Sequence, residues 1–227
     1  MNRYRHEFKY FLNSRNEQLL RIRAAGLLQP DAHAASDGTY LVRSLYFDDI
    51  QDSCLRENLA GTDPRSKFRI RYYNQDTAHL RLEKKSKTCG MTLKESCAIT
   101  RDECRMFLHG QVPCITADMD PVKQKLFAQI QLCSLSPKVI VTYERVPYVY
   151  PGGNVRVTFD RMLSSSVEIE AFLDGSYVTR PVFPLGQSLL EVKWDEVLPK
   201  HIRNALQLEE LSWTAFSKYG ICRTYHL

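Results

Sequence analysis

The chain has 227 residues, enough for one large domain, and its 44% hydrophobic content is sufficient for a folded core. No stretch approaches the roughly 18 apolar residues of a membrane-spanning helix, and the amino terminus lacks the apolar segment of a secretory signal, so we expect a soluble cytoplasmic protein. Seven cysteines, an odd number without metal-ligand spacing, predict free thiols.

The amino-terminal part of the chain is predicted to combine strands with two helices. Ser14-x-x-Glu17 has the spacing of a capping box, which opens an amphipathic helix. Asp48 or Asp49 can cap a second, shorter helix that Gly61 ends. The predicted elements are a strand over residues 5–12, a helix over 14–28, a strand over 39–47 and a helix over 48–59.

The second half of the chain contains further helix and turn signals. Thr100-x-x-Glu103 is another capping box, and Asp120-Pro121 places proline at the first position of a helix. Pro151-Gly152-Gly153 predicts a turn between two strands. The predicted elements are helices over residues 100–110 and 120–133, strands over 137–149 and 154–161, weaker strands over 167–171 and 177–182, a strand over 188–194 and a helical segment from 199.

Three central segments, residues 67–72, 81–87 and 92–96, carry alternating charge. Side chains two apart in a strand share a face, so Arg69 and Arg71 point away from Phe68 and Ile70. A strand with one solvated face also alternates. The same basic alternation, with carboxylates among the cations, recurs at residues 5–9, 156–160 and 191–193. This repetition favours a barrel whose cationic interior holds a polyanion.

We take as the candidate lining of such an interior Lys9, Arg69, Arg71, Arg81, Lys85, Lys87, Lys94, Arg145, Arg156, Lys193 and Lys218, together with Glu7, Glu83, Asp160 and Glu191. They would give the interior a net charge of +7, and the formal total of +5 then leaves −2 outside. A surface that coats nucleic acid is therefore not expected. The sequence predicts one α+β domain over residues 1–227: a mostly antiparallel closed β-barrel of about eight strands with flanking helices.

Several short motifs occur in an order that resembles a known family. They are Ser44-Leu45-Tyr46-Phe47-Asp48, Phe68-Arg69-Ile70-Arg71-Tyr72, Leu82-Glu83-Lys84-Lys85, Thr142-Tyr143-Glu144-Arg145, Arg156-Val157-Thr158-Phe159-Asp160, Leu190-Glu191-Val192-Lys193 and Phe216-Ser217-Lys218-Tyr219. Over residues 5–223 the chain resembles the VTC domain, the catalytic domain of the eukaryotic vacuolar transporter chaperone polyphosphate polymerase. That domain belongs to the triphosphate tunnel metalloenzymes, also called CYTH-like proteins.

The resemblance implies a β-barrel tunnel that holds ATP or inorganic polyphosphate, with Mn²⁺ or Mg²⁺ on a carboxylate. Arg69 and Arg71 resemble the paired phosphate-binding arginines, and Glu191 resembles the metal-binding glutamate. In the wider superfamily the amino-terminal motif is ExExK; here it reads Arg5-x-Glu7-x-Lys9, which leaves Glu7 as an alternative metal ligand. The expected catalytic residues are Arg69, Arg71, Lys85, Glu191 and Lys218, and the eleven interior cations given above are the expected phosphate ligands.

Three functions are compatible with such a lining. The leading hypothesis is transfer of the ATP γ-phosphate to a growing polyphosphate chain. The alternatives are a metal-dependent tripolyphosphatase or nucleoside triphosphatase, and a binding module without turnover. Transfer to a phosphate chain uses an oxygen already deprotonated near neutral pH, whereas hydrolysis needs an activated water. The six histidines show no paired spacing, which favours transfer.

Overall fold

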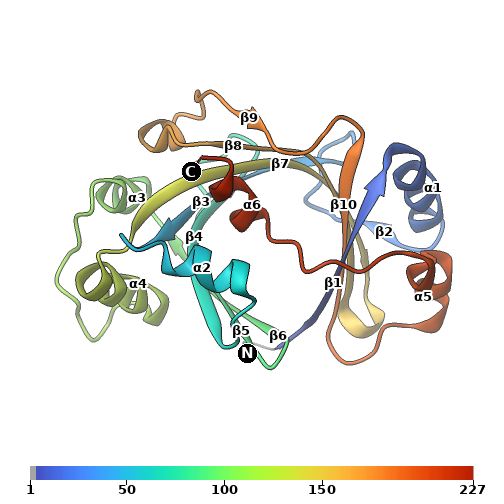
Figure 1. Cartoon of the computed structure of the whole chain (residues 1–227), viewed down its shortest axis with the longest axis horizontal. Coiled ribbons are helices and arrows are strands. Elements are labelled where there is room, and N and C mark those ends of the chain that lie inside the picture. The colour runs from blue at the N-terminus through green and yellow to red at the C-terminus, as the bar shows by residue number, and fades with distance from the viewer. Residues whose placement is uncertain (1–3, 227) are drawn as a thin grey trace.

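A computed structural model describes residues 4–226 and contains one large antiparallel sheet that curls around a central opening (Figure 1). The strands follow the spatial order β1-β10-β8-β7-β3-β4-β5-β6, and the short β2 and β9 pair with β7 and β8. Their bounds are β1 (His6–Asn13), β2 (Gln29–Pro30), β3 (Tyr40–Asp48), β4 (Arg65–Tyr73), β5 (Leu80–Thr88), β6 (Met91–Ile99), β7 (Ser136–Tyr150), β8 (Val155–Ser166), β9 (Arg180–Pro181) and β10 (Gln187–Trp194).

The two edges of the curled sheet meet where β1 approaches β6. The backbone N–H of Arg5 donates to the carbonyl of Thr92 at 3.0 Å, and the N–H of Thr92 donates back at 3.3 Å. This single bridge replaces the continuous ladder of a fully closed barrel. The predicted α+β class, with eight main antiparallel strands and flanking helices, is confirmed.

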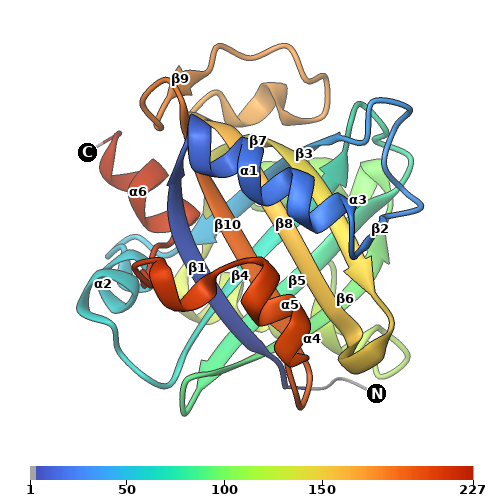
Figure 2. The same cartoon turned by 90° about the vertical axis from the view of Figure 1, so that its right-hand side faces the viewer.

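Helices α3 and α4 cover the outside of the sheet on one side and α1 and α5 cover it on the opposite side, whereas α2 and α6 lie at the opening (Figures 1 and 2). Their bounds are α1 (Ser14–Ala25), α2 (Ser53–Ala60), α3 (Arg101–Leu108), α4 (Pro121–Cys133), α5 (Lys200–Ala205) and α6 (Lys218–Thr224). The capping box predicted at Thr100 and Glu103 is present in full, and Asp120 caps α4 by accepting from Val122 N at 2.8 Å. Within residues 4–226, no helix has both the length and the apolar character needed to cross a membrane.

Two helices begin differently from the prediction. Asn13 rather than Ser14 caps α1, accepting from Asn16 N at 2.8 Å, because the Ser14 hydroxyl donates instead to the carbonyl of Gly186. Helix α2 begins later than expected, at Ser53. Asp48 nevertheless satisfies its first turn, accepting from Cys54 N at 2.8 Å and from Leu55 N at 3.0 Å.

Three predictions for the second half of the chain need correction. The strand expected over residues 167–171 is wrong: the 3₁₀-helix η2 (Ile169–Phe172) lies there, because Phe172 is buried against the Tyr72 ring. The strand expected over 177–182 shrinks to the two residues of β9. The helical segment from residue 199 is interrupted, since η3 (Leu208–Glu210) and an irregular stretch separate α5 from α6.

Two of the three hydrophobic clusters lie outside the sheet, between its outer face and the helices, whereas the third lies on the inner face that also carries Tyr46 and Tyr143. Phe68 and Ile70 of β4 and Leu82 of β5 are buried with Phe107 of α3 and Leu126 of α4. A second cluster joins β1, β8 and β10 to α1 and α5, and a third joins β3 and β7 to α6. Because alternate side chains point to opposite faces, burying the apolar residues of β4 outside turns Arg69 and Arg71 into the barrel.

Candidate functional site

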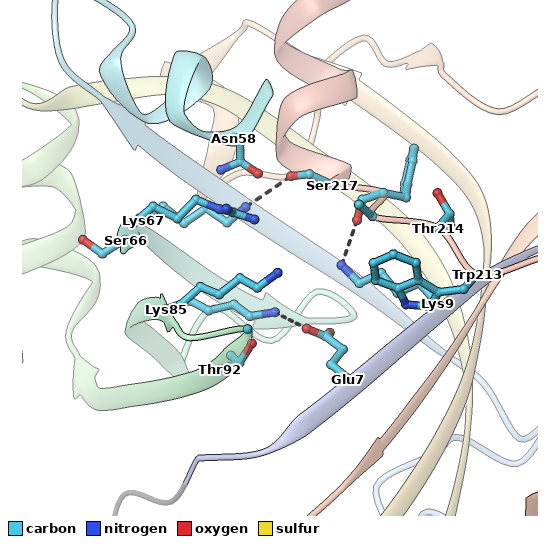
Figure 3. Close-up of a pocket in the computed structure, with 15 residues that line it drawn as sticks. Glu7, Lys9, Asn58, Ser66, Lys67, Lys85, Thr92, Trp213, Thr214 and Ser217 are labelled. Carbon is cyan, nitrogen blue, oxygen red and sulfur yellow. Dashed lines mark hydrogen bonds and ion pairs between the residues drawn. The ribbon is translucent and has the colours of Figure 1, made fainter. Parts of the chain in front are cut away.

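Three connected pockets run through the interior of the barrel and share Glu7 and Lys85 in their linings. We call them together the tunnel. The central pocket is lined by Lys9, Lys67, Arg69, Arg71, Arg145, Lys193, Lys218, Glu191, Tyr46 and Tyr143, among others. The pocket toward the Trp213 opening includes Asn58, Arg65, Lys87 and Trp213 (Figure 3). The pocket toward the Arg156 opening includes Arg5, Tyr73, Lys94 and Arg156.

On one wall of the tunnel, Arg69 of β4 lies opposite Glu83 of β5 in the strand register. Arg69 Nε and Nη2 donate to Glu83 Oε2 at 2.7 and 2.6 Å, and Lys94 Nζ lies 3.0 Å from Glu83 Oε1. Burial alone would raise the pKa of Glu83, but Arg69, Arg71 and Lys94 lower it far below its usual value. Glu83 is therefore ionised and fixes the direction of the Arg69 fork.

Arg71 shares this wall but has neutral partners. Its Nε donates to Ser44 Oγ at 2.9 Å and its Nη2 to Tyr143 OH at 3.1 Å. These hydroxyls hold the buried guanidinium in place without neutralising its charge. Arg71 can thus offer both charge and forked donors to an anion in the tunnel.

The opposite wall is built from β7, β8, β10 and α6. Arg145 and Asp160 lie opposite each other in the register of β7 and β8, with Nε–Oδ1 at 2.6 Å and Nη2–Oδ2 at 2.7 Å. Lys218 Nζ lies 2.6 Å from both Asp160 Oδ2 and Glu191 Oε1, and Lys193 Nζ lies 2.6 Å from Glu191 Oε2. Burial would lower the pKa of Lys218, but Asp160 and Glu191 raise it above its usual value. Cations and carboxylates on this wall hold one another in fixed positions.

Glu7 of β1 lies between the two walls. Its Oε2 accepts from Lys85 Nζ at 2.7 Å, and its Oε1 lies 3.4 Å from Lys193 Nζ. Burial would raise the pKa of Glu7, but Lys85, Lys9 and Lys193 lower it well below the usual value. Burial also lowers the pKa of Lys85 to about 8, since the attraction of Glu7 does not offset burial together with repulsion from Lys9 and Lys193.

Lys67 is a tunnel residue that the sequence interpretation left out. Its ammonium donates to Ser217 Oγ at 3.2 Å and lies 5.7 and 5.2 Å from the ring centroids of Tyr46 and Tyr219. Within the described part of the chain, Lys67 forms no ion pair. Burial and repulsion from neighbouring cations lower its pKa well below 10.5. The two-residue spacing Lys67-x-Arg69-x-Arg71 was the signal that could have identified it.

Lys67, Lys85 and Lys94 form a row across the sheet, because Lys85 is the register partner of Lys67 on β4 and of Lys94 on β6. Like charges directly opposite each other on neighbouring strands destabilise a sheet. An anion in the tunnel would remove this repulsion. Glu7 and Glu83 already pair with Lys85 and Lys94, so the remaining cost to the empty protein falls mainly on Lys67, and a phosphate ligand would offset it.

Most of the predicted site residues come together in the tunnel. Its linings contain Glu7, Lys9, Arg69, Arg71, Lys85, Lys87, Lys94, Arg145, Arg156, Glu191, Lys193 and Lys218. Arg81 is placed differently: its side chain is exposed, donates to Ser96 Oγ at 3.4 Å and is absent from these linings. Arg81 lies near the start of β5, so sharing a face with Glu83 does not bring it into the interior.

The carboxylates of the tunnel can hold a divalent ion only together with a substrate. Within residues 4–226, no cluster of three or more His, Cys, Asp or Glu side chains is arranged for a metal. Glu191 and Glu7 nevertheless face the same pocket. Mg²⁺ commonly binds one or two carboxylates and completes its shell with phosphate oxygens and water. The donor set thus fits Mn²⁺ or Mg²⁺ delivered with a phosphate ligand.

A family model for the VTC domain matches residues 4–226 of this chain. The chain belongs to the VTC domain family. Among curated proteins, no match was found. One similar solved structure is HpAC1 from Hippeastrum, described as a candidate adenylyl cyclase with a dominant triphosphatase activity. It has a TM-score of 0.58 and 16% identity, with coverage of 100% of this chain and 97% of that one.

A second similar structure is bh2851 from Bacillus halodurans, described as a candidate adenylate cyclase. It has a TM-score of 0.50 and 14% identity, with coverage of 92% of this VTC domain and 88% of that chain. At these identities the two likenesses establish the fold alone. The family therefore rests on the match to the VTC model, and the chemistry must be argued from the tunnel.

Proposed function

We propose that this VTC domain is a polyphosphate polymerase that transfers the γ-phosphate of ATP to a polyphosphate chain held in the tunnel. The observation that carries the proposal is the composition of the central pocket, where eight cationic side chains face two carboxylates. Phosphoryl transfer depends on positioning and on neutralising charge at the phosphate oxygens. Membership of the VTC family supports an activity on polyphosphate or triphosphate.

The arginines and lysines of the tunnel would bind a phosphate chain in different ways. Arg69 and Arg71 present planar forks that match the spacing of phosphate oxygens, while Lys67 and Lys9 supply point charges. Lys218 is held rigidly by Asp160 and Glu191, so it can orient a phosphoryl group without reorganising. Such pre-positioned charges stabilise the transferring phosphoryl group in the transition state.

The ionisation of the tunnel carboxylates favours transfer over hydrolysis. Burial would raise the pKa of Glu7 and Glu191, but the neighbouring lysines outweigh it and lower the pKa of both well below the usual value. Carboxylates with such lowered pKa values are poor bases for activating water. The terminal oxygen of a polyphosphate chain needs no base, because it is already deprotonated near neutral pH.

Glu191, with Glu7 beside the same pocket, would hold the divalent ion that the family implies. When bound with substrate, Mn²⁺ or Mg²⁺ would neutralise charge on the phosphate oxygens. Glu191 itself already accepts from Lys193 and Lys218. These lysines orient its carboxylate toward the pocket and keep it ionised.

A tripolyphosphatase is the second candidate, and Lys67 is the observation that favours it. An amine with a lowered pKa can be neutral and accept a proton from water. The Hippeastrum protein, with its described triphosphatase activity, has a related fold. Against hydrolysis, a bound triphosphate would raise the pKa of Lys67 and remove the base when it is needed. A binding module without turnover remains the third alternative.

The proposal is tested by incubating the pure protein with ATP and Mn²⁺ or Mg²⁺ and separating the products. We expect polyphosphate; free phosphate in its place identifies a hydrolase, and neither product identifies a binding module. Glu191→Gln should abolish turnover and retain tripolyphosphate binding, because the substitution removes the metal carboxylate but none of the cations. Glu209→Gln, on an exposed side chain, is the matched control. Unchanged activity of Glu191→Gln with Mn²⁺ would refute the metal assignment.

A further inference from the structure

The Trp213 opening of the tunnel carries a large exposed aromatic side chain (Figure 3). Trp213 is 60% exposed, whereas the other tryptophan, Trp194, is 7% exposed and stacks on His6. Phe216, three residues further on, has its ring packed against Phe11 and Phe183. Among the described residues, no comparable ring contact fixes the indole of Trp213. This apolar surface therefore remains available at the edge of a strongly cationic pocket.

The backbone holds Trp213 in place beside the cations. It forms a β-bridge with Tyr10 of β1, and the N–H of Thr214 donates to the carbonyl of Lys9 at 2.9 Å. The Lys9 ammonium in turn donates to the carbonyl of Phe216 at 2.8 Å. The segment between η3 and α6 is thus pinned to β1 on both sides of residue 215. The backbone that carries the indole is therefore anchored beside the cations and is not part of a free loop.

The pocket at the Trp213 opening has an aromatic side and a cationic side. Figure 3 shows the indole beside Lys9, across the pocket from Lys67 and Lys85. Uncharged polar side chains, Asn58, Ser66 and Thr214, line the same pocket, and Arg65 and Lys87 complete its cationic part. An aromatic face with amide and hydroxyl groups suits a base and a sugar, and the row of lysines suits phosphates. The two sides of the pocket therefore match the base and the phosphates of a nucleoside triphosphate.

The Arg156 opening offers a different environment. Its lining contains Arg5, Lys94, Arg156 and Lys193, which suit a chain of phosphates. Its aromatic residue, Tyr73, is 38% exposed and packs edge-on against Tyr40 with ring centroids 5.2 Å apart. A base would therefore find a less accessible ring at this end.

We propose that Trp213 stacks on the nucleobase of the donor nucleotide, so that ATP enters at the Trp213 opening while the phosphate chain occupies the side of the Arg156 opening. This inference rests on the proposed function, because it assumes that a nucleoside triphosphate is the donor. Every nucleobase has a π-face, so the indole selects nucleotides over inorganic phosphates rather than one base over another. Base–aromatic stacking corresponds to about a tenfold contribution to affinity.

The test compares ATP with tripolyphosphate, which has the phosphates but lacks the base. Calorimetric titration of Trp213→Ala should show ATP binding weakened about tenfold and tripolyphosphate binding changed less than about twofold. In the wild-type protein, ATP should quench tryptophan fluorescence more than tripolyphosphate does. Trp213→Phe should lose that difference, with buried Trp194 remaining as an internal reference.

The outcomes separate this inference from the proposed function. A wild-type protein that binds neither ligand overturns both. If both ligands bind and Trp213→Ala weakens them equally or not at all, the stacking site is refuted while the phosphate tunnel stands. Tyr73→Leu is the matched substitution at the other opening. A selective loss of ATP binding in that variant would place the base there and overturn the proposed direction of entry.

Discussion

The two walls of the tunnel use the same residue types to opposite effect. The β4–β6 wall, comprising Lys67, Arg69, Arg71, Lys85 and Lys94 with Glu83, has a net charge of +4. The α6 wall, comprising Arg145, Lys193 and Lys218 with Asp160 and Glu191, has a net charge of +1. The first wall has positive charge to share with a ligand, and the second is nearly neutralised within the protein.

Two lysines show what this difference means. Both are buried, which disfavours the charged form. Carboxylates of the α6 wall reverse that effect and raise the pKa of Lys218, while neighbouring cations reinforce it and lower the pKa of Lys67. Lys218 is therefore a fixed charge that the fold itself stabilises. Lys67 is a charge that becomes fully favourable only when an anion arrives.

The largest expected effect is on the stability of the α6 wall. Asp160→Asn removes the carboxylate that pairs closely with buried Arg145 and leaves Glu191 alone to balance Arg145, at 3.4 Å, and Lys218, at 2.6 Å. Breaking a buried pair in this way costs about 3–5 kcal/mol, which should appear as a lower free energy of unfolding in urea titrations. Tripolyphosphate should restore part of the loss, because it binds the folded state and supplies negative charge.

Asp174→Asn is the control for that experiment, since Asp174 is exposed and lies 4.0 Å from Arg101. Surface pairs of this kind contribute about 0–1 kcal/mol. If Asp160→Asn destabilises the protein no more than this control does, the α6 wall is not held together by its ion pairs.

How much of this site the sequence predicts depends on the kind of contact. Alternation along single strands correctly turned Arg69, Arg71 and Lys85 inward, because the period of a strand is fixed by its backbone geometry. The same reasoning assigned Arg81 to the interior, but periodicity gives the face of a residue and not its depth along the barrel. Whether a face is covered at a given level depends on where neighbouring strands end.

Contacts between side chains on different strands could not be predicted from the alternation within one strand. Asp160 was assigned to the interior, but its bidentate pairing with Arg145 depends on the register of β7 and β8. The position of Trp213 depends on an irregular segment that has no periodicity at all. The functional tunnel could thus be predicted from patterns, whereas its neutralised wall and its aromatic opening required the tertiary structure.

The next effect concerns ligand affinity on the β4–β6 wall. Arg71 has only hydroxyl partners, so Arg71→Ala removes a charged fork without exposing an unpaired carboxylate. Hydrogen bonds to charged groups contribute about 1.5–3 kcal/mol, which predicts tripolyphosphate binding weakened roughly ten- to a hundredfold in calorimetry. Arg71→Lys should recover only part, because charge returns without the fork.

Lys84→Ala is the control for Arg71, because Lys84 lies on the opposite side of β5 from Lys85, with its ammonium over the Phe68 ring. It should bind tripolyphosphate as the wild type does. Wild-type affinity in Arg71→Ala would remove this arginine from the phosphate site and undercut the whole assignment of the wall.

The smallest effect, and the most specific to the β4–β6 wall, is proton uptake by Lys67. Its pKa lies below 10.5 in the free protein because of burial and of repulsion from Lys85, Lys9 and Arg69, with Glu7 the nearby opposing charge. The unfolded chain therefore binds more protons than the folded protein above the lowered pKa, and stability falls as pH decreases through it. A bound polyanion has the opposite effect on Lys67: it raises the pKa of this amine, so that the amine takes up a proton when the polyanion binds.

Calorimetry of tripolyphosphate binding in buffers of different ionisation enthalpy should thus report proton uptake at mildly alkaline pH, with affinity decreasing as pH rises. Lys67→Met should reduce the uptake without abolishing it, because Lys85, with a pKa of about 8, contributes in the same direction. Affinity should fall less than in Arg71→Ala, since reversing the lowered pKa of Lys67 on binding offsets part of what this charge contributes. Lys84→Met is the control. Identical proton uptake in wild type and Lys67→Met would mean that Lys67 is already protonated in the empty tunnel. The two walls would then differ in net charge but not in how their lysines respond to a ligand.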